Sequence, residues 1–260
     1  GQFCSDGPSQ KNFLHMFLAF GLLSLHLCIT SSMSSYFPEC MNSLVNHLKR
    51  NGCIKNWQVE TVMIDVDRAF FCLPGTNPYL DAPQGIACQQ TISAPHIHAM
   101  SLEVLREQVS RTNGRVLDVG SGSGYVAAAF ATMNPSAIIF GIELHNDLVE
   151  WSKRNVQKLG HSLNNLHLRQ SNGWDGLLSE GPFDAINVGA AADTIPAKLA
   201  NSLKVGGRML IPVGPEGGVQ KIVRVDRVED SKANDPDVLH PPDFEFYEDM
   251  QVAFVPLTKE

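Results

Sequence analysis

Many of the signals that would assign a function directly are missing from this chain of 260 residues. It contains no G-x-x-x-x-G-K-[ST] sequence, which argues against a kinase or an enzyme that hydrolyses ATP. Its lysines and arginines are scattered and its formal net charge is −7, so no nucleic-acid-binding surface is expected. Internal repeats and low-complexity tracts are also absent. With 43% hydrophobic and 18% charged residues, however, the chain can build an ordinary globular core.

The cysteines are few and unpaired in their spacing. All six lie at or before position 88, at 4, 28, 40, 53, 72 and 88, and none belongs to a C-x-x-C pair. This distribution fits neither a disulfide framework nor a zinc site. His96 and His98 are two residues apart on an expected helix, where their side chains point to different faces. We therefore predict free thiols in a reducing compartment and no metal site.

The first 33 residues differ from the rest of the chain. Residues 13–29 are an apolar stretch that is short for a membrane span and is interrupted by polar residues. Three interpretations stay open: a translated upstream leader before a natural start at Met33, a secretory targeting segment, or a packed helix. We treat residues 1–33 as a leader outside the fold and residues 34–260 as one domain. A cytoplasmic protein without stable membrane association is expected.

The most informative stretch is VLDVGSGSG, at residues 116–124. A β-prone run ends in three glycines alternating with serines, and a helix-forming run follows. A strand, a tight turn and a helix N-terminus in this order receive nucleotide-like ligands in α/β proteins. Asp118 would repel a pyrophosphate but suits a zwitterion such as the amino-acid end of S-adenosylmethionine. Glu143 ends the next expected strand, 137–142, where an acid accepts hydrogen bonds from ribose hydroxyls.

The remaining patterns predict a helical N-terminal part and then an alternation of strands and helices. Apolar spacing indicates helices at about 44–51, after an Asn56 cap, and from about Ser93. Strands are expected at 116–119, 137–142, 166–169, 183–189, 208–213, 221–228 and 251–257, helices at 147–159 and 196–203, and an exposed loop at 229–242. The order favours an α/β fold of the class I S-adenosylmethionine-dependent methyltransferase type: a Rossmann-like, mostly parallel sheet with helices on both faces and an N-terminal helical segment.

Residues 90–99, QTISAPHIHA, resemble the signature of the protein-L-isoaspartate (D-aspartate) O-methyltransferases. Further segments match this family in consistent order over about residues 40–258. They are NPYLDAPQ at 77–84, DVGSGSG at 118–124, FDAINVGAAA at 183–192, PVGP with GG at 212–218 and VPLT at 255–258. The set is far more specific than any one motif. Residues 40–110 correspond to the N-terminal helices and the substrate loop.

The resemblance implies a repair reaction. The family transfers a methyl group from S-adenosylmethionine to the free α-carboxylate of L-isoaspartyl and D-aspartyl residues in damaged proteins. The methyl ester then closes to a succinimide, and hydrolysis of this ring returns some normal aspartate. A carboxylate with a pKa of about 4 is ionised at neutral pH, so this nucleophile needs no general base. The implied cofactor product is S-adenosylhomocysteine, the implied partners are isoaspartyl peptides and proteins, and the family's members are usually monomers.

The resemblance also implies a role for individual residues. Ser93 matches the active-site serine, whose hydroxyl would hold the substrate carboxylate; a plain helix N-cap is the alternative. His98 matches a cofactor-proximal position, although a satisfied helix histidine is the alternative. The implied cofactor-binding residues are Gln90, Thr91, Ile92, His98, Asp118, Val119, Gly120, Ser121, Gly122, Glu143, Leu144, Asn172, Gly173 and Thr258. Residues 118–122 would hold the methionine end, 143–144 the ribose, 172–173 the adenine, and Thr258 the closing segment.

The chain departs from the family pattern at three places. Asn172 replaces the usual aspartate, which predicts a cofactor affinity lower by roughly 1 kcal/mol because a charge-assisted hydrogen bond becomes neutral. Cys88 and Gln90 replace other residue types near the substrate loop. The sequence stops two residues after Thr258, which predicts a shortened lid. Two other functions are weighed against the repair enzyme: a methyltransferase with a different carboxylate acceptor, and an inactive, cofactor-binding adaptor.

Overall fold

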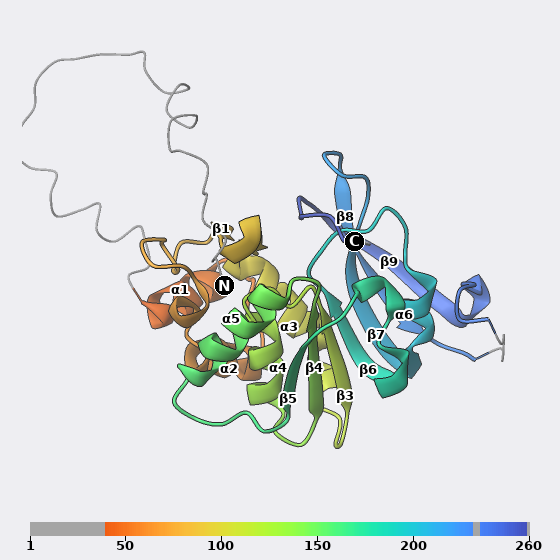
Figure 1. The fold of residues 1–260 in the computed structure, drawn as a ribbon, viewed down its shortest axis with the longest axis horizontal. Helices are drawn as coiled ribbons and strands as arrows, with labels where there is room; N and C mark the ends of the chain where they lie inside the picture. The colour runs from red at the N-terminus through yellow and green to blue at the C-terminus, as the bar shows by residue number, and fades with distance from the viewer. Residues whose placement is uncertain (1–39, 231–234, 259–260) are drawn as a thin grey trace, which may run out of the picture.

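The computed structural model describes residues 40–230 and 235–258, and Figure 1 gives the arrangement of the elements. The predicted leader, residues 1–33, lies outside the described residues. Among the described residues, three helices precede the main sheet: α1 (Met41–Arg50), α2 (Trp57–Asp65) and α3 (Pro95–Val109). The cap predicted for α2 is confirmed, because the Asn56 side chain accepts a hydrogen bond of 2.9 Å from the backbone N–H of Gln58.

The start of α3 corrects one alternative of the sequence analysis. The N-cap is Ala94, with φ −60° and ψ 147°, and Pro95 is the first helical residue. Proline is favoured at this position because its fixed φ suits the helix, and it keeps the residue before it extended. Ser93 therefore lies before the helix, and its interpretation as a plain N-cap is wrong.

The segment between α2 and α3 is irregular, as predicted. It contains two short 3₁₀ turns, η1 (Arg68–Phe71) and η2 (Ala87–Gln89). Two short strands, β1 (Gln84–Gly85) and β2 (Thr91–Ile92), pair antiparallel on either side of η2. Cys88 and Gln89 have positive φ angles of 57° and 58°, which lets the chain reverse between the two strands. The hairpin delivers residues 90–93 to the start of α3.

The main sheet has seven strands in the order β5-β4-β3-β6-β7-β8-β9. The pairs among β5, β4, β3, β6 and β7 are parallel, and the pairs β7–β8 and β8–β9 are antiparallel. The elements are β3 (Arg115–Val119), α4 (Tyr125–Met133), β4 (Ile138–Glu143), α5 (Asn146–Gln157), β5 (Leu166–Gln170), β6 (Phe183–Val188), α6 (Ala197–Asn201), β7 (Leu203–Val213), β8 (Gln220–Arg227) and β9 (Phe244–Val252). The predicted fold class, an α/β sheet that is mostly parallel, is confirmed.

The last strand was predicted in the wrong place. β9 spans Phe244–Val252, whereas the sequence indicated a strand at 251–257. The sequence of this strand is rich in acids because many of its positions face solvent, so it does not read as a strand. Tyr247, for example, is exposed, and the Arg224 guanidinium lies over its ring at 3.8 Å. The residues after β9 form a tail that lies against the segment after β6, where Ala191 forms a bridge with Pro256.

Adjacent residues of each strand enter different hydrophobic cores, as the pleat requires. Val116 and Ile139 pack with apolar residues of α1 to α5 on one face of the sheet. Leu117 and Phe140 pack with α6 and with the turn η3 (Gly173–Asp175) on the other face. Figure 1 shows this uneven covering, with α1 to α5 gathered beside one half of the sheet and α6 next to β6 and β7. The prediction of helices on both faces holds.

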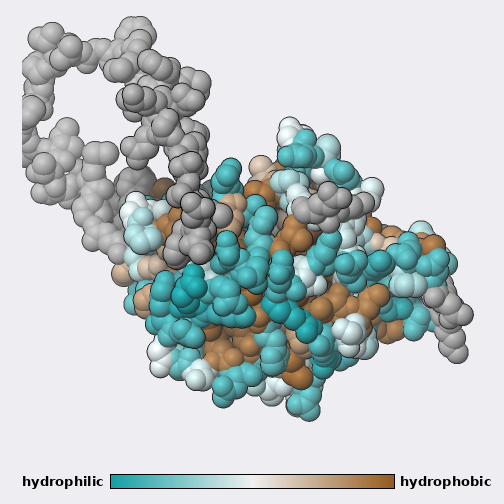
Figure 2. Space-filling model, viewed as in Figure 1, coloured by the Kyte–Doolittle hydropathy of each residue, from teal (hydrophilic) through white to brown (hydrophobic). Residues whose placement is uncertain are grey.

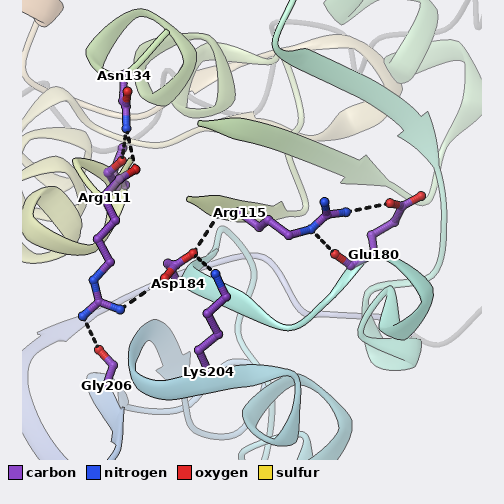
Figure 3. Close-up of polar contacts among 8 residues, drawn as sticks. Arg111, Arg115, Asn134, Glu180, Asp184, Lys204 and Gly206 are labelled. Carbon is purple, nitrogen blue, oxygen red and sulfur yellow. Dashed lines mark hydrogen bonds and ion pairs between the residues drawn. The ribbon is translucent and has the colours of Figure 1, made fainter. Parts of the chain in front are cut away.

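The amino ends of the strands are held by a buried carboxylate (Figure 3). Asp184, at the start of β6, accepts hydrogen bonds from Arg111 Nη1 at 3.2 Å, the Arg115 backbone N–H at 2.9 Å and Lys204 Nζ at 2.6 Å. Arg115 also pairs with Glu180 at 2.8 Å and donates to its carbonyl oxygen. These three donors, two of them charged side chains, engage both carboxylate oxygens, so this acid is structural.

The surface in Figure 2 mixes hydrophilic residues with scattered apolar ones. Among residues 40–230 and 235–258, no helix combines the length and apolar character needed to cross a membrane. Cys40, Cys53 and Cys72 in this described part are free thiols, as predicted. Cys4 and Cys28 lie outside it. Within the same residues, no group of three or more His, Cys, Asp or Glu side chains is placed to hold a metal ion.

Candidate functional site

A cavity lies at the carboxyl ends of β3 and β6, where strand order reverses in doubly wound sheets and ligands bind. Asp118 and Asn187 are register partners on these strands. The cavity brings together eight of the residues singled out from the sequence: Thr91, Ile92, Ser93, His98, Asp118, Gly120, Ser121 and Gly122. They come from the β2 hairpin, from α3 and from the glycine-rich turn, so three separate segments converge on one space.

The glycine-rich turn after β3 has the backbone that its sequence predicts. Gly120, Gly122 and Gly124 have φ angles of +68°, +52° and +88°, a region that L side chains rarely adopt. The turn also runs close to the end of β6, because a Cβ on Gly189 would lie 2.9 Å from the carbonyl oxygen of Gly120. Two backbones therefore meet at this part of the cavity wall.

Asp118 is the unusual group of the site. It is 2% exposed, and its Oδ1 accepts a hydrogen bond of 2.7 Å from Asn187 Nδ2. Its Oδ2 is buried and has no hydrogen-bond partner among the described residues. Burial raises the pKa of this carboxyl from 3.8 to about 7, although hydrogen bonding from Asn187 and from the backbone N–H of Ala127 lowers it. A buried acceptor without a partner, beside a cavity, is the place for a donor that carries positive charge.

Glu143 closes the opposite side of the turn. Its carboxylate accepts backbone hydrogen bonds from Gly122 at 3.1 Å, from Leu144 at 2.7 Å and from His145 at 3.2 Å. Two of these bonds go to Oε1 and one to Oε2, and a carboxylate offers about four acceptor sites. The acid is thus fixed in place with acceptor capacity left for a hydroxyl group. Leu144 contributes its backbone N–H to this arrangement.

The predicted adenine-side residues form the turn η3 after β5. Asn172 Oδ1 accepts a hydrogen bond of 3.0 Å from the Trp174 backbone N–H, which caps this turn. Gly173 is buried, and a Cβ on it would lie 2.5 Å from Cγ1 of Val119 and 3.1 Å from Cδ1 of Leu257. The structure thus places the Val119 side chain against Gly173 and outside the cavity lining. The contact joins the ends of β3 and β5.

Replacing Gly173 with alanine is expected to lower the free energy of unfolding by about 1–3 kcal/mol, because the added methyl overpacks the contact with Val119. Val119→Ala removes the atom that clashes. The cost of the double variant is therefore expected to be clearly smaller than the sum of the two single costs. Urea unfolding of the four proteins measures this. Additive costs would show that the two residues do not share a contact.

Ser93 has the exposure and position that its predicted role requires. It is half-buried, it lines the cavity, and its hydroxyl makes no hydrogen bond to another described residue. Its hydroxyl is therefore available to a ligand. Gln90 is held in the hairpin, where its backbone bonds Ile86 at 2.8 Å and Ala87 at 3.2 Å, and it does not line the cavity.

The tail that follows β9 returns to the site. The Phe254 backbone N–H donates to Gln220 Oε1 at 2.6 Å, and the Phe254 ring lines the cavity. Leu257 donates its N–H to the Ala191 carbonyl at 2.7 Å, and its own carbonyl accepts from Trp174 Nε1 at 3.0 Å. These bonds bring the tail beside the turn that holds Asn172. Thr258 follows directly; it is exposed and outside the cavity lining.

Several lining residues were not predicted from the sequence. Asn187 and Gly189 belong to the matched segment 183–192, but no role was assigned to them. A polar residue that ends an otherwise apolar buried strand was the available signal, since carboxyl ends of parallel strands meet at one edge. Tyr125, the first residue of α4, lies in the lining as well; its ring stacks on His98 with centroids 4.6 Å apart. No pattern in the sequence indicates this pair.

Comparisons with known proteins agree with this geometry. The family described as Protein-L-isoaspartate(D-aspartate) O-methyltransferase (PCMT) matches residues 39–260. The chain is 41% identical over 225 residues to a Protein-L-isoaspartate O-methyltransferase of Triticum aestivum, which covers 85% of this chain and 92% of that protein. It is 36% identical over 259 residues to Protein-L-isoaspartate O-methyltransferase 2 of Arabidopsis thaliana, covering 98% of this chain and 79% of that one.

A solved structure is similar in fold as well as in sequence. It is the crystal structure of a Plasmodium falciparum protein assigned to the same family, in complex with S-adenosyl-L-homocysteine. The TM-score is 0.71 at 30% sequence identity, and the match covers 86% of this chain and all of that one. The similarity therefore extends over the sheet, the N-terminal helices and the site.

Proposed function

We propose, because the chain belongs to the protein-L-isoaspartate(D-aspartate) O-methyltransferase family, that it methylates the free α-carboxylate of L-isoaspartyl and D-aspartyl residues in damaged proteins. The methyl donor is S-adenosylmethionine, and the product is S-adenosylhomocysteine. The observation that carries the proposal is the buried Asp118 Oδ2, which has no partner among the described residues and lies in the same cavity as Ser93.

The residues present fit this cofactor. Asp118 is an acceptor for the ammonium group of its amino-acid end, and the glycine turn leaves room for backbone approach. Glu143 is fixed by three backbone bonds and keeps acceptor capacity for ribose hydroxyls. Asn172, Gly173 and the tail around Thr258 lie further along the same edge for the adenine end. When bound, the cofactor supplies a methyl group on a positively charged sulfur.

The task of the protein is then positioning rather than proton transfer. The substrate carboxylate is ionised at neutral pH and attacks without a general base. Ser93 Oγ donates a hydrogen bond to this carboxylate and aligns it, because its hydroxyl is otherwise unbonded within the described chain. Phe254 and Ile92 help to exclude water from the cavity that they line. Alignment and exclusion of water are worth several kcal/mol in such reactions.

A single assay tests the proposal. Transfer of labelled methyl groups from S-adenosylmethionine is measured on an isoaspartyl peptide and on its normal aspartyl twin. Base-labile label on the isoaspartyl peptide alone is the expected result. If S-adenosylhomocysteine binds and neither peptide is labelled, the protein is an adaptor or uses a different carboxylate acceptor. The absence of any binding would contradict the cofactor assignment itself.

The Asn172→Asp variant is expected to bind S-adenosylhomocysteine about fivefold more tightly than the natural chain. The aspartate would keep the bond to the Trp174 N–H and make a charged acceptor for the adenine amino group. Charge-assisted hydrogen bonds exceed neutral ones by roughly 1 kcal/mol. Titration calorimetry measures the difference. An unchanged affinity would mean that this side chain does not meet the adenine.

The proposal extends to the working state of the protein. It acts as a monomer in the cytoplasm, without nucleic acid and without stable membrane association. The scattered basic residues and the net charge of −7 support the proposal that the protein does not bind nucleic acid. Light scattering coupled to size-exclusion chromatography at micromolar concentration tests the monomeric state. A measured mass equal to that of a dimer would contradict it.

A further inference from the structure

One arginine is buried beneath the cavity without an anionic partner. Arg68, the first residue of η1, is 0% exposed. Its Nη1 lies 3.1 Å from His98 Nδ1, while Nε and Nη2 make no hydrogen bond within the described residues. A charge removed from water costs several kcal/mol unless it is paired. Burial of this arginine therefore lowers the stability of a core in which leucine could have stood at the same position.

Two acids of this region, the chain neighbour Asp67 and Asp81, are engaged by other groups. Asp67 accepts from the Ala69 backbone N–H at 2.9 Å and from the Tyr79 hydroxyl at 3.1 Å. Asp81 accepts from the backbone N–H and the ring of His96, at 2.9 Å and 2.8 Å. No ion pair of Arg68 forms with any carboxylate in the described part of the chain. Its positive charge is left to act toward the cavity.

The contact between Arg68 and His98 fixes the state of the histidine ring. Guanidinium groups only donate, so Nδ1 of His98 must accept, and the ring is the neutral Nε2–H tautomer. Nε2 has no partner among the described residues, and the residue lines the cavity. Burial, then the charge of Arg68 and that of His96, hold the pKa of His98 well below 6.5. The ring thus keeps an N–H donor and does not become a cation.

The orientation of the ring is fixed a second time by Tyr125. This side chain is fully buried, and its ring stacks on His98 with centroids 4.6 Å apart and planes at 28°. Tyr125 directly follows Gly124 of the glycine turn, so the ring position is tied to the turn that forms the cavity wall. Three elements, η1, α3 and α4, therefore hold one imidazole.

We propose that Arg68 is a positioning residue, which through His98 directs an N–H donor and positive potential at a carboxylate bound in the cavity. The inference rests on the proposed function, because that reaction brings two carboxylates to this cavity: one on the cofactor and one on the substrate. Either of these carboxylates supplies the negative charge that Arg68 does not find among the described residues. Because the neutral imidazole of His98 lies between them, the Arg68 guanidinium stays out of the cavity. An arginine inside the cavity would form an ion pair directly with the bound carboxylate and would compete for the group that reacts.

The tautomer is tested first, on the intact natural chain. In long-range ¹H–¹⁵N NMR spectra, His98, assigned by comparison with the His98→Gln variant, is expected to show the Nε2–H form from pH 5.5 to 8. A ring protonated at Nδ1, or one that titrates near its usual pKa, would overturn the proposal. This measurement needs no Arg68 variant to fold.

Ligand binding tests the coupling. Arg68→Met is expected to weaken the binding of a carboxylate ligand about tenfold or more, and Arg68→Lys to recover part of the loss. In the His98→Gln background, Arg68→Met should change affinity much less, because its effect passes through the ring. Equal losses in both backgrounds would overturn the proposal. Arg208→Met is the control, since Arg208 pairs with Asp226 at 2.6 Å away from the cavity lining and should leave affinity unchanged.

Two ligands identify which carboxylate is involved. S-adenosylhomocysteine carries the amino-acid end, and methylthioadenosine lacks it. A loss for the first ligand alone assigns the cofactor carboxylate, and an increase in the KM of the isoaspartyl peptide alone assigns the substrate carboxylate. No change in either refutes the inference. If the protein binds S-adenosylhomocysteine but methylates no isoaspartyl peptide, the proposed function fails while the tautomer and the binding results still decide this point.

Discussion

Asp118→Asn is expected to weaken S-adenosylhomocysteine binding by roughly 100-fold while leaving the ligand-free protein as stable as before, or more stable. The loss follows because the variant offers a neutral group to the ligand's ammonium. The gain follows because Oδ2 of the natural residue is buried without a partner in the described residues, and burial disfavours its charge. An asparagine keeps the Oδ1 acceptor for Asn187, so the bond of 2.7 Å survives.

The matched control is Asp184→Asn, at the other end of the same sheet. Asp184 is as buried as Asp118, at 3% against 2% exposed, but accepts bonds from Arg111, Arg115 and Lys204 (Figure 3). Its variant should lose about 1–3 kcal/mol of stability and keep its affinity for the ligand. Calorimetry at pH 8 and thermal unfolding measure both quantities. If Asp118→Asn destabilised the protein and bound normally, Asp118 would be a structural acid.

The parallel half of the sheet was predictable because its strands are buried on both faces. Runs such as residues 116–119 and 183–188 carry apolar residues on both faces, and glycine or proline turns bound them. β9 could not be found in this way. It is an edge strand whose outer positions carry acids and Tyr247, and its apolar partner positions, such as Phe244, are few. The sequence of an edge strand with this composition cannot be distinguished from the sequence of a loop.

The residues of the site also differ in how far the local sequence predicts them. Residues that belong to one continuous motif, such as Asp118 and Gly120, could be predicted because the local sequence fixes the turn that presents them. Asn187 and Arg68 could not, since each acts on a partner far away in the chain: Asn187 on Asp118, and Arg68 on His98. Such pairs come together only when the strands and helices have packed.

Other residues were predicted only because the sequence resembles the family. Val119 and Gly173 were assigned to the cofactor, and the structure gives them a packing contact with each other. A family match marks a position as constrained without giving the reason, and close packing of β3 against the η3 turn constrains it as strongly as a ligand does. The contribution of Gly173 and Val119 to binding stays a prediction.

The affinity of the natural protein for S-adenosylhomocysteine is expected to rise with pH up to about 7 and then to level off. Burial raises the pKa of Asp118 to about 7 in the ligand-free protein, and the ligand's ammonium favours the ionised carboxylate. Below pH 7, binding must therefore expel a proton, and affinity falls by up to about tenfold per pH unit. His98 adds no slope in this range, because its pKa is held well below 6.5 by burial.

Stability changes in the opposite direction in the ligand-free protein. The folded-state pKa of Asp118 lies above its ordinary value of 3.8, so the folded state holds the proton that the unfolded state has lost between about pH 4 and 7. Unfolding free energy from this group therefore declines as pH rises through that window, and bound ligand removes the decline. Calorimetry in two buffers of different ionisation enthalpy counts the released proton, and Asp118→Asn serves as the control. A slope that persists in this variant would assign the proton to another group, and no slope in the natural protein would mean that Asp118 is ionised before the ligand arrives.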